Sequence, residues 1–236
     1  VGNLTRNVVL RSENPVNPGH TLATGNSEID VRYTQTIHMG RTKAEPVDDS
    51  VLDPVVTICT NCKGRYAVHM HHNDGTCSTP EKPYQFVLLG NVVEWGRKWG
   101  VAIHGSHYGL QEGNIIHSVG EKAGSGIAFE DGSEWKNTLR HNLFVGLENG
   151  GRATEDSEVT FGDPDGKRGT GMWARGQGND VLDNVSADTQ EGLGWYTGSR
   201  ESGPLGPGII VSRPNFPCAD TMNPTQSISS YASAVP

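Results

Sequence analysis

A short strand pattern recurs five times along the chain and constrains its fold more than any other feature. The copies are AVHMHHND from Ala67, GVAIHGSH from Gly100, GIAFEDGS from Gly126, GMWARGQG from Gly171 and GLGWYTGS from Gly192. In each copy the second and fourth residues are mostly apolar, and this period of two is typical of a β-strand with one buried face. We therefore expect the second and fourth side chains to point inward and the third and fifth to point outward.

A second pattern, a short strand that carries an asparagine, follows most of these copies. It occurs at Asn91, Asn114, Asn142 and Asn184, and the segment RNVVL at Asn7 also fits it. Asparagine tolerates left-handed backbone angles and bonds its own turn, so stacked coils would select a column of asparagines at equivalent bends. The spacings of 23, 28 and 42 residues along the last four copies are irregular, and loop insertions would absorb the difference, as they do in solenoids.

Together the two patterns predict an all-β chain that folds as a right-handed parallel β-helix, a solenoid of about six or seven coils with long loop insertions. We expect the β-helix over residues 1–213 and a C-terminal cap or tail over residues 214–236. The 31 glycines and 13 prolines suit short strands and tight turns. No stretch sustains the apolar spacing of an amphipathic helix.

Charge and cysteine content narrow the classes of partner and location. The formal net charge of -8 argues against nucleic acid as the main partner, and the short apolar runs argue against insertion into a membrane. Four cysteines, Cys59, Cys62, Cys77 and Cys218, favour disulfides of open pairing and a secreted or cell-surface location. Because the first residues already read as part of a coil, we expect the chain to belong to a larger polypeptide or assembly.

Four ordered motifs resemble a known family. They are GRYAVHMHH at 64–72, WGVAIHGSHYGL at 99–110, EDGSEWKNTLRHNL at 130–143 and NDVLDNVSADTQEGLGWY at 179–196. The motifs resemble the parallel β-helix of the cell-migration-inducing hyaluronidase, transmembrane protein 2 and fibrocystin-like proteins and their bacterial relatives, over about residues 1–210. The resemblance implies a β-helix in a surface or secreted protein and, as in a few animal members, hyaluronan depolymerisation.

The outward face carries the densest cluster of titratable side chains that the pattern places on one surface. Successive coils stack about 4.7 to 4.9 Å apart, so residues at one position of the pattern form a column. The fifth-position column consists of His71, His104, Glu130, Arg175 and Tyr196, with His69 at the third position and His72 and Asp131 at the sixth. Two imidazoles and a carboxylate on consecutive coils would reach one metal ion or substrate.

One chemistry that fits the cluster is metal binding. His69, His71 and His104, with a carboxylate, would bind a divalent metal such as Zn²⁺ or Cu²⁺, because imidazole and carboxylate ligands suit these ions. Calcium is a further candidate through the DPDG segment at 163–166, although Asp-Pro and Asp-Gly also form plain turns.

Two other chemistries need no metal. Glu130 and Asp131 would supply acid and base for glycoside cleavage, although adjacent residues on a strand usually point apart. Alternatively, a histidine abstracts a proton beside a uronate while Arg175 or Arg65 neutralises its carboxylate.

These observations predict a hyaluronidase-like polysaccharide depolymerase, either a hydrolase or a lyase, at the surface of or outside the cell. Its predicted catalytic residues are His71, His104, Glu130, Asp131 and Arg175, and its predicted substrate-binding residues are Arg65, Trp173 and Tyr196. The alternative is a non-catalytic carbohydrate-binding or structural segment of a larger surface protein or filament, because solenoids present repetitive surfaces whether or not they catalyse. The remaining histidines, His20, His38, His107, His117 and His141, are expected at turns or on the surface.

Overall fold

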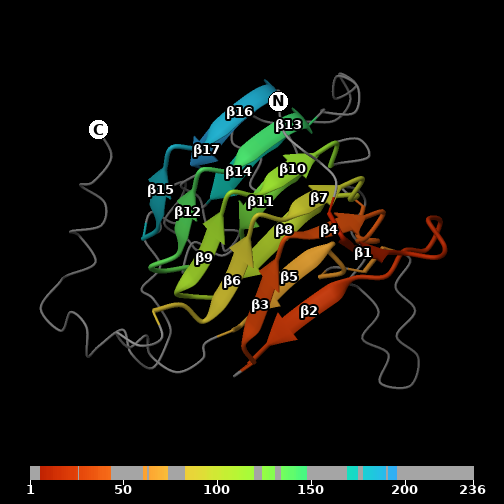
Figure 1. The fold of residues 1–236 in the computed structure, drawn as a ribbon, viewed down its shortest axis with the longest axis horizontal. Coiled ribbons are helices and arrows are strands. Elements are labelled where there is room, and N and C mark those ends of the chain that lie inside the picture. Colours follow the sequence, from red (N-terminus) through yellow and green to blue (C-terminus); the bar gives the residue numbers. More distant parts are fainter. Residues whose placement is uncertain are drawn as a thin grey trace, which may run out of the picture.

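The structure is a computed structural model that describes residues 6–25, 27–43, 61, 62, 64–73, 83–119, 124–130, 134–147, 169–174, 178–189 and 191–195. Over these ranges the chain forms 17 β-strands and no helix. Every ladder between neighbouring strands is parallel, and strands three apart in the sequence lie side by side in three sheets (Figure 1). The chain is therefore a parallel β-helix, as predicted, and its right-handedness stays a prediction.

Sheet A contains β1 (Val8–Arg11), β4 (Thr34–Ile37), β7 (Val92–Glu94), β10 (Ile115–His117), β13 (Leu143–Leu147) and β16 (Val185–Thr189). Sheet B contains β2 (Thr21–Thr24), β5 (Val68–His71), β8 (Trp99–His104), β11 (Ser125–Phe129), β14 (Thr170–Ala174) and β17 (Glu191–Trp195). Sheet C contains β3 (Ile29–Arg32), β6 (Phe86–Leu89), β9 (Gly109–Glu112), β12 (Thr138–Arg140) and β15 (Asp180–Leu182). Each coil passes through sheets B, C and A in that order.

The apolar positions of the repeated pattern fill the axis of the solenoid. Val101 pairs with Ile127 and Ile103 pairs with Phe129 in the ladder between β8 and β11, and all four side chains are buried in one core. The prediction that the second and fourth residues of each copy point inward is confirmed for these coils. Burial of such branched and aromatic side chains is the main favourable contribution to folding.

Glycine stands first in four of the five copies because neighbouring coils meet there. A Cβ atom on Gly100 would lie 2.8 Å from the carbonyl oxygen of Gly126, and one on Gly126 would lie 2.6 Å from the carbonyl oxygen of Gly171. Only a residue without a side chain permits this approach. The repeated glycine is thus a condition for stacking sheet B at its observed register.

A ladder of asparagine side chains joins the coils at the start of sheet A. The backbone N–H of Asn91 donates to Oδ1 of Asn114, that of Asn114 to Oδ1 of Asn142, and that of Asn142 to Oδ1 of Asn184, each at 2.9 Å. The side-chain amide of Asn114 also donates to the carbonyl oxygen of Leu88 and to Oδ1 of Asn142. The predicted asparagine column is therefore confirmed.

The physical reason for the column differs from the one expected. The left-handed backbone angles belong to the residue before each asparagine, Gly90, Gly113, His141 and Asp183. The asparagine side chains bond the neighbouring coil, and that of Asn142 also donates to the carbonyl oxygen of Arg140 in its own turn at 3.0 Å. Asn7 does not join the ladder, because Val8 pairs with Thr34, whose N–H donates to Oδ1 of Asn91 at 3.0 Å. The inclusion of Asn7 was wrong by one residue.

The outer face of sheet B departs from the expected alternation. Ala102, Ala128 and Trp173 occupy third positions of the pattern, yet all three are buried, and they form a second apolar cluster with Tyr66 and Trp99. Period-two alternation separates two faces of a strand but does not say which of them is covered. The expectation of a solvated outer face is wrong for these residues.

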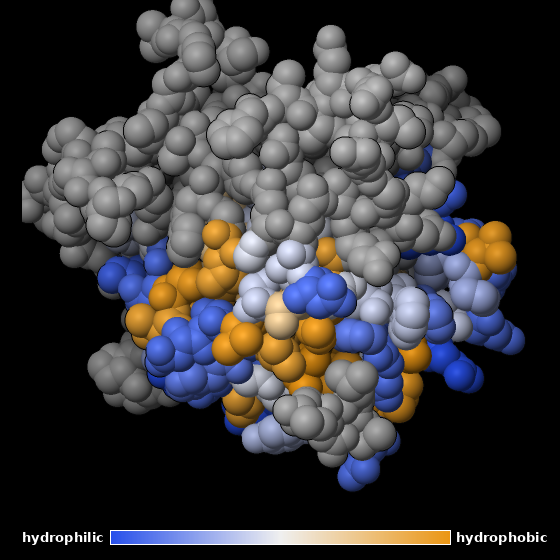
Figure 2. Space-filling model, turned by 90° about the horizontal axis from the view of Figure 1, so that it is seen from above, coloured by the Kyte–Doolittle hydropathy of each residue, from blue (hydrophilic) through white to orange (hydrophobic). Residues whose placement is uncertain are grey.

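On the face seen in Figure 2, hydrophobic residues of the described part lie between hydrophilic ones. Within the described ranges no helix has the length and hydropathy that a membrane crossing requires. Cys62 takes part in a disulfide. The other three cysteines lie outside the described residues, and the pairing stays a prediction.

Replacing Asn114 with alanine is expected to destabilise the β-helix by about 3 kcal/mol, since it leaves the buried N–H of Asn91 and the carbonyl of Leu88 without the side-chain bonds they make now. Urea unfolding followed by circular dichroism measures the change. Asn17→Ala is the matched control, because Asn17 is exposed, and it should shift stability by less than about 0.5 kcal/mol. Equal effects of the two variants would contradict a stabilising ladder.

Candidate functional site

Strand register brings three of the predicted site residues together. His71 at the end of β5 pairs with His104 at the end of β8. Ile103 pairs with Phe129, and the N–H of Glu130 donates to the carbonyl oxygen of Ile103 at 2.9 Å. The column of His71, His104 and Glu130 predicted from the sequence is therefore present on consecutive coils.

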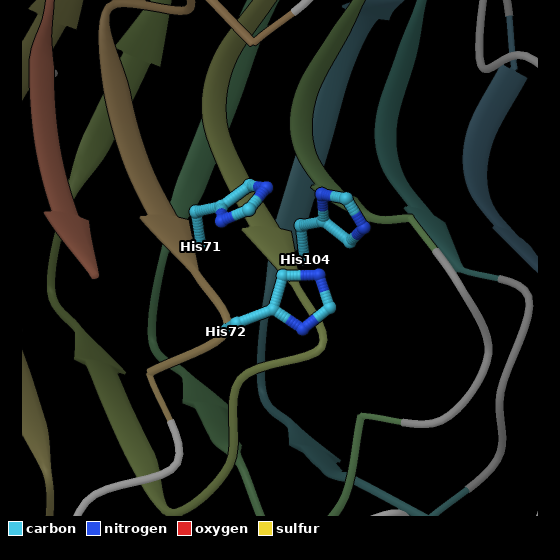
Figure 3. Close-up of side chains that lie close together, drawn as sticks. All are labelled: His71, His72 and His104. Carbon is cyan, nitrogen blue, oxygen red and sulfur yellow. The ribbon is translucent and has the colours of Figure 1, made fainter. Parts of the chain in front are cut away.

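Three imidazole rings converge where β5 and β8 end (Figure 3). The ring centroids of His71 and His104 are 4.7 Å apart, those of His72 and His104 are 4.7 Å apart, and those of His71 and His72 are 4.5 Å apart. The cluster therefore brings several ring nitrogens, which are good ligands for transition metals, to one place on the surface.

A pocket of about 380 Å³ opens beside these rings. It is lined by Leu22, Gly64, Arg65, His69, His71, His104 and Glu130, and we call it the histidine pocket. Within it, Nδ1 of His104 lies 3.5 Å from Oε2 of Glu130. The structure thus joins Arg65, a predicted substrate ligand, to the predicted histidines and Glu130.

His69 is the most deeply placed group of the pocket, with 2% of its surface exposed. Its Nδ1 lies 2.9 Å from the carbonyl oxygen of Gly64, so Nδ1 carries the proton and donates it, and Nε2 keeps its lone pair. Nε2 is buried and has no hydrogen-bond partner in the part of the chain that the structure describes. Burial, and secondarily the neighbouring His71 and His104, lower the pKa of His69 to about 3. The ring is therefore neutral at physiological pH.

Among the described residues, two overlapping groups of side chains could hold a metal ion. His69, His104 and Glu130 each offer one ligand atom, and these atoms lie within 4.8 Å of one another; His71, His72 and His104 form the other group. The group of His69, His104 and Glu130 is better arranged for metal binding, because the carbonyl of Gly64 fixes the orientation and tautomer of His69. A carbonyl or carboxylate bonded to the second ring nitrogen is the usual support of a metal-bound histidine.

Of the remaining predicted site residues, three are not tested by the structure and one is buried away from the histidine pocket. Asp131, Arg175 and Tyr196 lie outside the described residues. Trp173 points outward as predicted, but only 1% of its surface is exposed, and its ring stacks on Trp99 with centroids 5.8 Å apart. The substrate-binding role predicted for Trp173 requires an accessible ring, which the covered outer face of sheet B does not offer here.

The sequence did not predict the role of the Gly64 carbonyl in the histidine pocket or the burial of His107. The carbonyl of Gly64 orients His69, and a backbone group leaves no side-chain signal, although glycine suits the left-handed φ of 74° at that turn. His107, expected at a turn or on the surface, lies in the connection between β8 and β9 but is buried, and its Nδ1 accepts the backbone N–H of Trp135 at 3.1 Å. Burial, with a smaller contribution from His72, lowers the pKa of His107 to about 4.

His107 should make stability depend on pH. Between pH 6.5 and 4 the unfolded chain protonates this histidine while the folded chain does not, so stability falls as the pH falls through that window. Replacing His107 with asparagine keeps an acceptor for Trp135 and removes the titration. Between pH 7 and 5 we expect wild type to lose about 2 kcal/mol more than His107→Asn, measured by urea unfolding in the presence of a chelator. Identical pH profiles would contradict the buried neutral ring.

The fold and the pocket define a class, a parallel β-helix with a histidine and carboxylate cluster on its outer surface. Within that class the chain belongs to the CEMIP β-helix family, whose family model matches residues 58–213. No curated protein and no solved structure gives a significant match to the chain.

Proposed function

We propose that this chain is a hyaluronidase-like polysaccharide depolymerase with the histidine pocket as its active centre. Membership of the CEMIP β-helix family supports the substrate class and an extracellular or cell-surface location. The observation that carries the proposal is the buried Nε2 of His69, which has no hydrogen-bond partner among the described residues and lies beside His104 and Glu130. Burying an unpaired polar group is costly, so a ligand that satisfies it accounts for the arrangement better than packing does.

The active centre, in this proposal, contains a divalent transition metal held by His69, His104 and Glu130. Two imidazoles and a carboxylate suit Zn²⁺ or Cu²⁺ better than Ca²⁺, which prefers oxygen ligands. Three protein ligands would leave a coordination position for water or a substrate oxygen, as catalytic sites require. Glu130 is the one carboxylate among the described residues that line the pocket.

The other polar residues of the pocket have roles that fit an acidic polysaccharide. Arg65 lines the pocket, and the planar fork of an arginine guanidinium group is suited to the carboxylate of a uronic acid. His71 lies beside His104 at the rim, where an imidazole can move a proton to or from the glycosidic linkage. The cluster therefore offers both binding and proton transfer for cleavage of a uronate-containing chain.

Metal analysis tests the centre directly. After complete chelation and reloading with Zn²⁺, the chain should retain one ion, and His69→Ala should lower the affinity at least about tenfold. His141→Ala is the control, because His141 is an exposed histidine whose contacts are with Glu112 and Asp183. Mass spectrometry gives the stoichiometry, and competition with a chelating dye gives the affinity. Failure to retain an ion, or equal loss in the control, would remove the metal from the proposal.

The reaction is tested by incubating the chain with hyaluronan, chondroitin and pectin, with Zn²⁺ and after chelation. Wild type should release new chain ends, and His104→Ala and Glu130→Gln should slow release by about 100-fold or more with unchanged circular dichroism. Ends that absorb in the ultraviolet identify a lyase, and saturated ends identify a hydrolase. No new ends from any polymer would overturn catalysis and favour the alternative of a non-catalytic carbohydrate-binding or structural segment.

A further inference from the structure

A second and larger pocket, of about 590 Å³, lies where coils leave sheet A and turn toward sheet B. Its lining includes Pro15, His38, Trp95, Arg97, His117 and Asp188, and we call it the tryptophan pocket. It has no lining residue in common with the histidine pocket. It is therefore a separate feature, built by a different corner of the coil.

The tryptophan pocket follows a column of residues at or near the ends of sheet A strands, one from each of five successive coils. Register aligns Ile37, Glu94, His117, Val145 and Ala187 across sheet A. The next residues in sequence, His38, Trp95, Ser118, Gly146 and Asp188, all have left-handed φ angles between 50° and 61°, and all five line the pocket. Because coils are about 4.8 Å apart, the column presents a different side chain at each step along the solenoid axis.

Trp95 is the most unusual member of that column. Its side chain is 52% exposed, and its left-handed φ of 57° is unfavourable for a large aromatic residue. The ring stands between His38, stacked at 6.1 Å, and His117, edge-on at 6.2 Å. Below it, buried Glu94 accepts a hydrogen bond from Gln35 at 2.5 Å and lies 3.9 Å from Nδ1 of His117. These contacts hold the Trp95 ring in place while the residue stays 52% exposed.

Arg97 holds another part of the pocket lining in place. Its guanidinium donates to the carbonyl oxygens of Pro15 at 3.2 Å and Val16 at 2.9 Å, so the segment before Gly19 is tied to the coil that carries Trp95. Ser118 and the carboxylate of Asp188 supply hydroxyl and acceptor groups along the column. The pocket therefore combines an aromatic ring with a positively charged donor, Arg97, a negatively charged acceptor, Asp188, and the hydroxyl group of Ser118.

We propose that the tryptophan pocket binds a segment of a glycan chain. The apolar C–H face of a sugar ring packs on an exposed aromatic face such as that of Trp95. The hydroxyl groups of the sugar both donate and accept hydrogen bonds, so they match the donor Arg97, the acceptor Asp188 and the hydroxyl of Ser118. A chain of sugar units extended along the solenoid axis would meet successive corners. Mixed charge in the pocket and the net charge of -8 disfavour a phosphate polyanion. This binding does not depend on catalysis or on a metal in the histidine pocket.

Isothermal titration of the full chain with oligosaccharides of hyaluronan, chondroitin and a neutral β-glucan tests the site. We expect binding to at least one glycan. Trp95→Ala should weaken the affinity by about tenfold or more, because the variant loses one aromatic stacking contact and the apolar area that this contact buries. Tyr33→Ala is the matched control, because Tyr33 is also an exposed aromatic residue at a left-handed corner but does not line the pocket. The control should bind as wild type does.

His104→Ala separates this site from the active centre. If it loses cleavage while the affinity that depends on Trp95 remains, the two pockets act independently and the inference stands even where the proposed catalysis fails. If wild type binds none of the glycans, or if Trp95→Ala binds as wild type while His104→Ala abolishes binding, the tryptophan pocket is not a glycan site. Circular dichroism of each variant checks that the β-helix is intact.

Discussion

The register between neighbouring coils is the constraint on which both pockets depend. Side chains on a strand alternate with a period of two, so a slip of one residue would turn His71 and His104 into the core. Parallel backbone bonds allow such a slip, but the asparagine ladder opposes it, because a displaced Asn114 would leave buried amide groups unpaired. The glycine contacts between Gly100 and Gly126 act in the same direction. The interactions that stabilise the solenoid therefore also position its chemistry.

The sequence predicted those parts of the structure that follow from periodicity. Alternation identified the inward residues Val101 and Ile103, and aligning the copies placed His71, His104 and Glu130 in one column. Periodicity says nothing about what covers a face, so it could not predict the burial of Trp173. It also could not predict the bond from His69 to the carbonyl of Gly64, since a backbone acceptor has no sequence signature.

The burial of Trp173 gives it a different role from the one expected. Tyr66, Trp99 and Trp173 form an aromatic cluster on the outer side of sheet B, and the ring of Tyr66 lies edge-on to His69 with centroids 5.1 Å apart. The Tyr66 and Trp99 rings are 4.5 Å apart. Such packing restricts the imidazole of His69 to few orientations and lowers the local dielectric, which strengthens its interactions with a bound charge. Trp173 thus belongs to the support of the histidine pocket.

Columns in this solenoid differ in composition according to what they do. The ladder at the start of sheet A repeats asparagine from Asn91 to Asn184, because each of these coils makes the same bond to the next. By contrast, the column through Trp95 changes at each coil although its backbone angles are nearly constant. The histidine pocket likewise combines imidazole, carboxylate and guanidinium groups. Uniform backbone geometry with varied side chains is what recognition of a chemically specific ligand requires, whereas packing between identical coils would be met by repeating one residue.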